Sequence, residues 1–205
     1  MTEKFTVYLV DDDPGVLKAL SRLLRAEGHD VKPYSSPQVF LEEHDVAVPG
    51  CVVLDVSMPG LDGLEIQRVL TTASGYHRPV VFVTGKGDIP TSVRAMKAGA
   101  IDFLTKPVKD KDLFEAVSRA EARDAESRRL HSELESIQAK VSNLTPRERE
   151  VLTHVVAGRL NKQIAGDLGT VEKTIKVHRS RMMEKLGIRM VADLVRMAEK
   201  LNLSK

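Results

Sequence analysis

The chain has 205 residues, 42% of them hydrophobic and 29% charged, which suits one large or two small domains with a core in each. Its single cysteine, Cys51, excludes an internal disulfide, and no apolar stretch is long enough to span a bilayer. Because the first residues also lack a signal-peptide pattern, we expect a cytoplasmic protein without membrane contact.

The net charge of +2 is distributed unevenly along the chain. Residues 1–110 contain 12 Lys and Arg against 15 Asp and Glu, residues 111–140 contain 6 against 7, and residues 141–205 contain 13 against 7. The three segments therefore carry −3, −1 and +6. An acidic front with a basic end is expected when only one end meets a polyanion.

Residues 1–110 alternate between apolar strand patterns and amphipathic helix patterns. Asp13-Pro14 and Ser36-Pro37 place a capping side chain before a proline at two of the helix starts. The alternation predicts an α/β doubly wound domain with a five-stranded parallel sheet. Strands are predicted at about 5–10, 30–34, 50–54, 79–83 and 100–104, and helices at about 14–27, 37–44, 62–73 and 88–97.

Chemically active side chains follow four of these strands. Asp11 and Asp12 come after the first strand, Asp55 after the third, Thr84 ends the fourth, and Lys106 comes after the fifth. Because the carboxyl ends of parallel strands share one edge of the sheet, we expect these side chains to converge. Each is by itself an ordinary surface or turn residue, so the prediction rests on their joint order.

The acids at this edge predict a metal site. Asp11 and Asp12 beside Asp55 would repel one another and raise their pKa values unless a cation lay between them. Mg²⁺ prefers oxygen ligands and is commonly held by carboxylates, whereas a zinc site requires Cys or His. We therefore predict Mg²⁺ as the cofactor, with ordinary surface acids as the alternative. Asp13 is expected to be a helix cap.

The order of an acid pair, Asp55, Thr84 and Lys106 at strand ends resembles the pocket of response-regulator receiver domains. The segment 55–63 is similar to the receiver loop after the phosphorylated Asp, and the segments 84–88 and 95–104 are similar to the FixJ-type subgroup in particular. The resemblance implies that Asp55 accepts a phosphoryl group, with Lys106 supplying a cation and Thr84 a hydroxyl for the phosphoryl oxygens.

The same resemblance assigns roles to neighbouring residues. It implies that Ser57 gives a backbone carbonyl to the metal, that Phe103 is a switch that moves with Thr84, and that the peptide bond before Pro107 is cis. A buried strand aromatic is the alternative reading of Phe103. Ser57 and Lys86 lie at loop positions that could tune the lifetime of the phosphate.

Two rival functions fit parts of this pattern. Phosphotransferases or phosphatases of the haloacid-dehalogenase type also form an aspartyl phosphate on a doubly wound sheet, but they would want an acid at the position of Ser57. The other rival is a DNA-binding regulator whose receiver acts only as a dimerisation scaffold. We favour a phosphorylated regulator that is not an enzyme.

Residues 112–141 lack Gly and Pro and predict one long helix that continues the last helix of the first domain. Continuing its first apolar seam would place Asp124 and Ser127 inside, which interrupts any coiled coil. A marginal dimer seam is our preference, and a solvated single-helix spacer is the alternative. The two seams consist of Leu113, Val117 and Ala120, and of Leu130, Leu134, Ile137, Val141 and Leu144.

A capping box of Thr145, Pro146 and Glu148 opens a second domain. A short helix at 161–168 stops at Gly169, and a longer helix follows at about 172–186. Two helices joined by so tight a turn predict a helix-turn-helix within an all-α four-helix domain.

The helix at 172–186 has two different faces. At about 100° per residue, Ile175, Met182 and Leu186 share the core side. Cations, a hydroxyl and a methyl-bearing side chain on the other side suit base edges and phosphates in a major groove, although a merely solvated basic face is the alternative. The predicted DNA-binding residues are Lys173, Thr174, Lys176, Val177, Ser180, Arg181, Asn161 and Lys162.

The segments 144–152, 158–165 and 173–182 resemble the LuxR/NarL-type output domain. One departure is Val171, which occupies the position of the usual Ser or Thr cap, so Thr170 is considered as the cap instead. The last helix is similar to the dimerisation helix of that family, although packing within the domain would explain its pattern equally well.

Together these features predict a two-component response regulator. A sensor histidine kinase would phosphorylate Asp55, the phosphorylated chain would form a homodimer through a face that includes Arg94, Lys97 and Phe114, and two output domains would bind half-sites of double-stranded promoter DNA. The predicted domains are a receiver at 1–110, a helical linker at 111–140 and a DNA-binding domain at 141–205.

Overall fold

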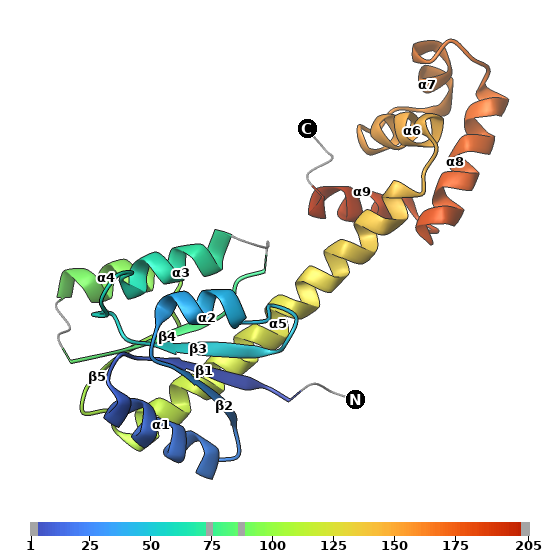
Figure 1. Cartoon of the computed structure of the whole chain (residues 1–205). Helices are drawn as coiled ribbons and strands as arrows, with labels where there is room; N and C mark the ends of the chain where they lie inside the picture. Colours follow the sequence, from blue (N-terminus) through green and yellow to red (C-terminus); the bar gives the residue numbers. More distant parts are fainter. Residues whose placement is uncertain (1–3, 73–75, 86–88, 202–205) are drawn as a thin grey trace. The chain divides into compact units, whose positions relative to one another are not determined.

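The computed structural model describes residues 4–72, 76–85 and 89–201 (Figure 1). The chain divides into two compact units, an N-terminal unit at Met1–Arg129 and a C-terminal unit at Leu130–Lys205. Of the predicted features, Lys86, the last residue of the helix at 62–73 and the first residue of the helix at 88–97 lie outside the described residues. None of the helices in the described ranges is both long and apolar enough to cross a membrane.

The N-terminal unit alternates strands and helices as the sequence predicts. Within the described residues, its five parallel strands have the order β2-β1-β3-β4-β5. The elements are β1 (Thr6–Val10), α1 (Pro14–Ala26), β2 (Asp30–Tyr34), α2 (Pro37–Glu43), β3 (Gly50–Leu54), α3 (Gly63–Thr72), β4 (Val80–Thr84), α4 (Ile89–Lys97), β5 (Asp102–Thr105) and α5 (Asp110–Ser142).

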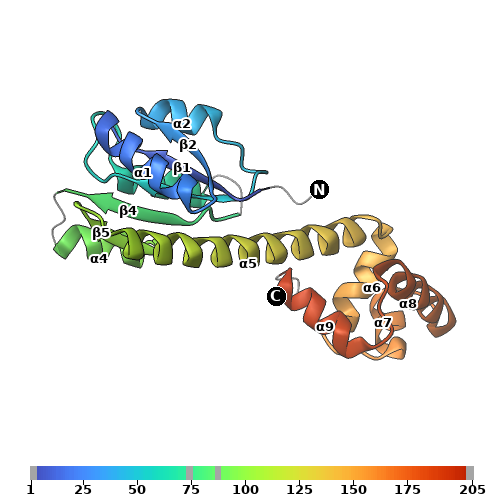
Figure 2. The ribbon, with the colours of Figure 1, turned by 90° about the horizontal axis from the view of Figure 1, so that it is seen from below.

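Helices cover both faces of this sheet (Figures 1 and 2). Strand residues alternate between the faces, so Val7 and Leu9 pack with α1 and α5, whereas Tyr8 and Val10 pack with α2, α3 and α4. The three inner strands β1, β3 and β4 are therefore buried along their whole length. Pro33 is tolerated in β2 because β2 is an edge strand.

Side-chain caps begin two of the helices, as the sequence predicts. Asp13 Oδ1 accepts hydrogen bonds from the backbone N–H groups of Gly15 (2.7 Å) and Val16 (3.3 Å), and Ser36 Oγ accepts one from Val39 (3.4 Å). Pro14 and Pro37 follow the caps, where a missing N–H costs nothing.

The helix predicted at 112–141 is slightly longer, since α5 runs from Asp110 to Ser142. Its buried residues within the N-terminal unit are Leu113, Ala116, Val117, Ala120 and Asp124. The first four are apolar and pack on the sheet beside α1. Asp124 continues the same stripe as a carboxylate, and its side chain is only 2% exposed.

The C-terminal unit is built from helices. Beyond the end of α5 it contains α6 (Pro146–Val156), α7 (Asn161–Asp167), α8 (Glu172–Leu186) and α9 (Val191–Lys200) within the described residues. The turn between α7 and α8 includes Gly169 with a φ of 59°, a conformation that favours glycine. Val171 is the N-cap of α8 and makes no side-chain cap, so the Thr170 alternative is wrong.

The predicted capping box at the start of α6 is confirmed. Thr145 Oγ1 accepts from the backbone N–H of Glu148 (3.3 Å), and Glu148 Oε2 accepts from the backbone N–H of Thr145 (2.9 Å). The Lys185 ammonium, carried on α8, also contacts Glu148 Oε2 at 2.7 Å. These hydrogen bonds hold the pKa of Glu148 at about 2, below its ordinary value of 4.5.

We expect Glu148→Gln to lower the free energy of unfolding of the C-terminal unit by about 1.5–3 kcal/mol near neutral pH, because the charged acceptor of a buried ion pair is lost. The folded-state pKa is depressed, so the carboxylate's contribution is fully present above pH 4.5 and is lost as the pH falls toward 2. The difference between the parent and the variant should therefore shrink in that range. Urea unfolding of the 130–205 fragment, followed by circular dichroism, measures it.

The matched control is Glu150→Gln on the same helix. Glu150 pairs with Arg147 at the surface, and its side chain is 50% exposed, so the variant should lose less than about 1 kcal/mol. Equal losses in the two variants would contradict the special role of Glu148.

Candidate functional site

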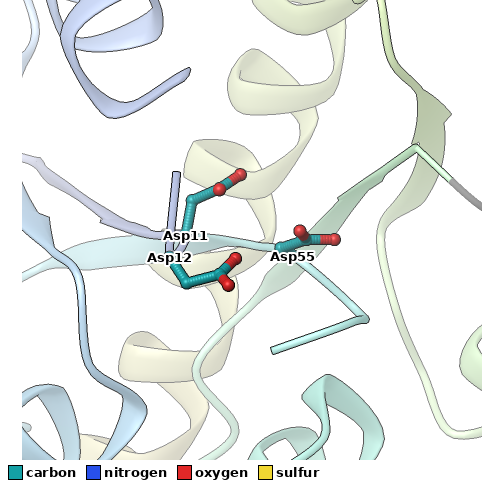
Figure 3. A group of neighbouring side chains, drawn as sticks. All are labelled: Asp11, Asp12 and Asp55. Carbon is teal, nitrogen blue, oxygen red and sulfur yellow. The ribbon is translucent and has the colours of Figure 1, made fainter. Parts of the chain in front are cut away.

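Three carboxylates gather at one edge of the parallel sheet (Figure 3). Asp11 and Asp12 follow β1, and Asp55 follows β3. One oxygen from each lies within 4.8 Å of the others. Asp11 and Asp55 are buried, at 1% and 7% exposed, whereas Asp12 is open to solvent.

The sheet topology explains why these acids meet. β1 and β3 are neighbours with Val10 opposite Leu54, so the residues that follow each strand lie side by side. The backbone N–H of Asp55 donates to the carbonyl of Val10 at 2.9 Å, which extends the ladder up to the site. Strand order reverses between β1 and β3, and such a switch point opens a crevice at the carboxyl ends of the strands.

Lys106 joins two of these acids. Its ammonium donates to Asp11 Oδ2 at 2.5 Å and to Asp55 Oδ2 at 3.0 Å. The residue is placed by the hydrogen bond from its backbone N–H to the carbonyl of Thr84 (2.8 Å), and the peptide bond to Pro107 is cis, as the sequence resemblance implies. Lys106 therefore reaches across from β5 to the ends of β1 and β3.

The pKa values of the pair reflect burial and pairing together. Burial raises the pKa of Asp11, and the hydrogen bond from Lys106 offsets only part of this effect. Burial lowers the pKa of Lys106, but its hydrogen bonds to Asp11 and Asp55 outweigh this and leave the pKa raised. Lys106 thus remains a cation beside the carboxylates throughout the physiological range.

Thr84 and Phe103 occupy the remaining strand positions. Thr84 is fully buried at the end of β4, opposite Thr105 in β5. Phe103 is half-buried in β5 and packs against Phe82, with 6.0 Å between ring centroids. This packing agrees with a strand aromatic, the alternative reading of the sequence, and the switch role of Phe103 stays a prediction.

The loop after Asp55 is shaped by close backbone contacts. Ser57 is exposed, and its backbone N–H donates to Asp55 Oδ1 at 3.3 Å. Gly63 has no room for a side chain, because a Cβ there would lie 2.5 Å from the carbonyl oxygen of Asp55. Asp13 caps α1, as expected, and its backbone N–H donates to Asp11 Oδ1 at 2.9 Å.

The residues present fit a hard divalent cation. The donors are carboxylate oxygens, with Asp11, Asp12 and Asp55 close enough to share one ion. Mg²⁺ takes such ligands together with waters and phosphate oxygens. The three negative charges exceed the single positive charge of Lys106, so a further cation would lower the repulsion among them.

A second group of predicted residues lies on α8 and at the start of α7. Ile175, Met182 and Leu186 are buried, as the face analysis predicts. Thr174 and Asn161 are half-buried, and the remaining predicted residues are exposed: Lys162, Lys173, Lys176, Val177, Ser180 and Arg181. The chain thus presents a basic, mainly solvent-exposed face opposite the core side of α8.

Two residues of this region were absent from the sequence prediction. Glu172 pairs with Lys176 at 3.1 Å, and Arg179 Nη1 donates to Asn161 Oδ1 at 2.9 Å. The first pair has i,i+4 spacing and was visible in the sequence. The second joins α8 to the start of α7, and only the packing of the two helices reveals it.

Two family descriptions match the chain. Residues 7–118 match the response regulator receiver domain, and residues 142–198 match bacterial regulatory proteins of the luxR family. The first range contains the carboxylate cluster, and the second contains the basic face of α8.

Similar proteins match almost the whole chain. The transcriptional regulatory protein FixJ of Azorhizobium caulinodans is 41% identical over 201 residues, which cover 97% of this chain and 93% of that protein. The solved structure of the response regulator StyR is 45% identical with a TM-score of 0.79, covering 96% of this chain and 99% of that one. Full-length FixJ from B. japonicum is 35% identical with a TM-score of 0.58, covering 99% of each chain.

Proposed function

Because the chain belongs to the response regulators that join a receiver domain to a luxR-family DNA-binding domain, we propose that Asp55 is its phosphoacceptor. A partner histidine kinase donates the phosphoryl group, and the modified protein forms a homodimer that binds promoter half-sites and controls transcription. In this proposal residues 1–110 are the receiver, 111–140 the helical linker and 141–205 the DNA-binding domain. In this proposal the protein acts in the cytoplasm as a transcription regulator and not as an enzyme.

The observation that carries the proposal is the convergence of Asp55 with Lys106 and two further acids at one strand edge. Attack by an Asp55 carboxylate oxygen forms a P–O bond as the P–N bond to the kinase's phosphohistidine breaks. Lys106 offers its ammonium to the incoming phosphoryl oxygens, and Thr84 offers its hydroxyl. Asp11, Asp12, Asp55 and the Ser57 carbonyl would hold Mg²⁺, which supplies positive charge to those oxygens when bound.

Phosphorylation changes the charge that Lys106 and Thr84 face. We propose that Thr84 moves toward the phosphoryl group and that Phe103 follows it, which alters the surface formed by α4, β5 and α5. Exposed apolar side chains on α4 support a dimer contact there, since Ile89 is 79% exposed, Val93 44% and Met96 45%. Arg94, Lys97 and Phe114 are the further residues proposed for this contact.

DNA binding is proposed for the exposed face of α8. Lys176, Val177 and Ser180 would reach base edges in the major groove, while Lys173, Thr174 and Arg181, with Asn161 and Lys162 at the start of α7, would contact phosphates or edges at the flanks. The charge of the segment from 141 to 205, +6, favours a polyanionic partner.

The first test is phosphate uptake from acetyl phosphate. Asp55→Asn should abolish labelling while leaving the fold, because the amide keeps the shape of the side chain but cannot accept the group. Sedimentation of the parent should show mostly monomer without the phosphodonor and dimer with it. Asp62→Asn, an exposed acid of the same loop, is the control and should label normally. Labelling of Asp55→Asn at the parental rate would overturn the assignment.

The second test concerns the metal. Asp12→Ala should raise the Mg²⁺ concentration needed for half-maximal labelling by about tenfold, because one oxygen donor is removed. Calorimetric titration with Mg²⁺ alone gives the affinity directly. Asp13→Ala is the control, because Asp13 is the residue next to Asp12 and caps α1. Loss of this cap should cost about 1 kcal/mol of stability without changing Mg²⁺ affinity. Equal Mg²⁺ affinities in both variants would contradict the proposed ligand set.

The third test separates base contacts from phosphate contacts. On a duplex selected from a random pool by the phosphorylated protein, Lys176→Ala should cost about 1–3 kcal/mol and relax sequence preference. Arg181→Ala should weaken binding to all sequences and lower the salt slope by about one unit. Arg196→Ala on α9 serves as the control, because Arg196 is exposed and pairs with Asp193. Unchanged affinity in the first two variants would mean that another face binds DNA.

A further inference from the structure

A buried polar network attaches α5 to the N-terminal unit beyond its apolar stripe. Asp124 lies four residues after Ala120, the last of the buried apolar residues of this stripe. Tyr76 Oη donates to Asp124 Oδ1, and Arg128 Nε donates to Asp124 Oδ2 at 3.0 Å. Both oxygens of this buried carboxylate are therefore engaged.

Arg128 contacts the loop between α2 and β3 at three consecutive carbonyls. Its Nη1 donates to Ala47 O at 2.7 Å, and its Nη2 donates to Val46 O at 2.9 Å and Val48 O at 2.6 Å. The guanidinium also lies over the Tyr76 ring, 4.6 Å from its centroid. Arg128 thus binds the loop through Nη1 and Nη2, while its Nε pairs with Asp124 of the same helix.

A second arginine binds the same loop from the start of β4. Arg78 is 5% exposed, and its Nη2 donates to Asp45 O at 2.7 Å and Val48 O at 3.0 Å. Its guanidinium lies 4.8 Å from the centroid of the Tyr8 ring. Val48 O accepts from both arginines, so the position of the loop depends on both.

This network is joined through two strands to the phosphoacceptor site. β3 begins at Gly50, two residues after Val48, whose carbonyl both arginines bind, and ends at Leu54, next to Asp55. β4 begins two residues after Arg78 and ends at Thr84. The network therefore lies at the amino ends of the strands whose carboxyl ends carry the proposed chemistry.

Burying the polar pair of Asp124 and Arg128 costs solvation free energy, which suggests that the pair does more than stabilise the fold. Burial raises the pKa of Asp124, because the buried carboxylate is less well solvated than in water. The charge of Arg128 opposes this effect only in part. Apolar residues of similar volume often stabilise such a position as well or better. What the polar pair adds is a defined position of the helix relative to the loop.

We propose that Asp124 and Arg128 form a clamp that fixes the extension of α5 to the N-terminal unit, and that phosphorylation raises DNA affinity only while this clamp holds. Both are positioning residues and take no part in phosphoryl transfer. The chain passes into the C-terminal unit directly after Arg129, so the clamp lies where any change in the receiver reaches the rest of α5. The proposal rests on the proposed function.

The test uses the full chain, acetyl phosphate and the selected duplex. Arg128→Met should incorporate phosphate at a rate within about twofold of the parent, while the phosphorylation-dependent gain in DNA affinity falls about tenfold, a typical size for coupling between two sites. Hydrogen exchange at the 45–48 amides should become faster. Arg129→Met is the matched control, because Arg129 is exposed and pairs with Glu126 on the same helix, and it should keep the full gain.

A double variant, Asp124→Leu with Arg128→Met, separates coupling from stability. The apolar pair avoids a buried unpaired charge and should restore thermal stability. Under the proposal this stable variant still lacks the gain in DNA affinity. An equal gain in DNA affinity in the double variant and the parent would overturn the clamp proposal and leave the proposed function standing. Absence of any gain in the parent would overturn the proposed function and the coupling role with it.

Discussion

The repulsion among carboxylates collected at one strand edge is the constraint on which the N-terminal unit depends. A parallel sheet brings the ends of β1 and β3 together, and each strand is followed directly by an acid. Lys106 offsets part of this repulsion, because its ammonium forms ion pairs with both Asp11 and Asp55. Lys106 follows β5, which pairs with β4, so the charge balance of the site depends on the strand order. A phosphoryl group added at Asp55 would disturb that balance, which makes the edge suited to sensing.

The fold carries this edge on buried strands. β1, β3 and β4 are buried along their whole length, and helices pack on both of their faces. Close-packed interiors transmit displacement better than loosely packed ones. The sheet is therefore a suitable path between the carboxyl edge and the loop at its opposite edge, where Arg78 and Arg128 bind the same carbonyl of Val48.

In the C-terminal unit a buried charged residue connects two helices. Glu148 closes the capping box of α6 and contacts Lys185 of α8, so one carboxylate orients two helices. The core side of α8 is held by Ile175, Met182 and Leu186. The basic residues on the other face of α8, Lys173, Lys176 and Arg181, are exposed.

The order of elements followed from local patterns that residues near in sequence create. Alternating strand and helix periods, the caps at Asp13 and Thr145, and the acids after β1 and β3 could be recognised without coordinates, because each depends on neighbours along the chain. A resemblance to known families added the prediction that Asp55, Thr84 and Lys106 act together at one phosphoacceptor site. Only the tertiary structure decided which side chains form hydrogen bonds with each other. The sequence predicts Asp124 as an interruption of a helical seam, and only the structure shows that it is buried against Tyr76 and Arg128. Likewise, only the structure shows that the Asn161 side chain accepts a hydrogen bond from Arg179. Such pairings depend on the packing of distant segments, so no periodicity in the sequence records them.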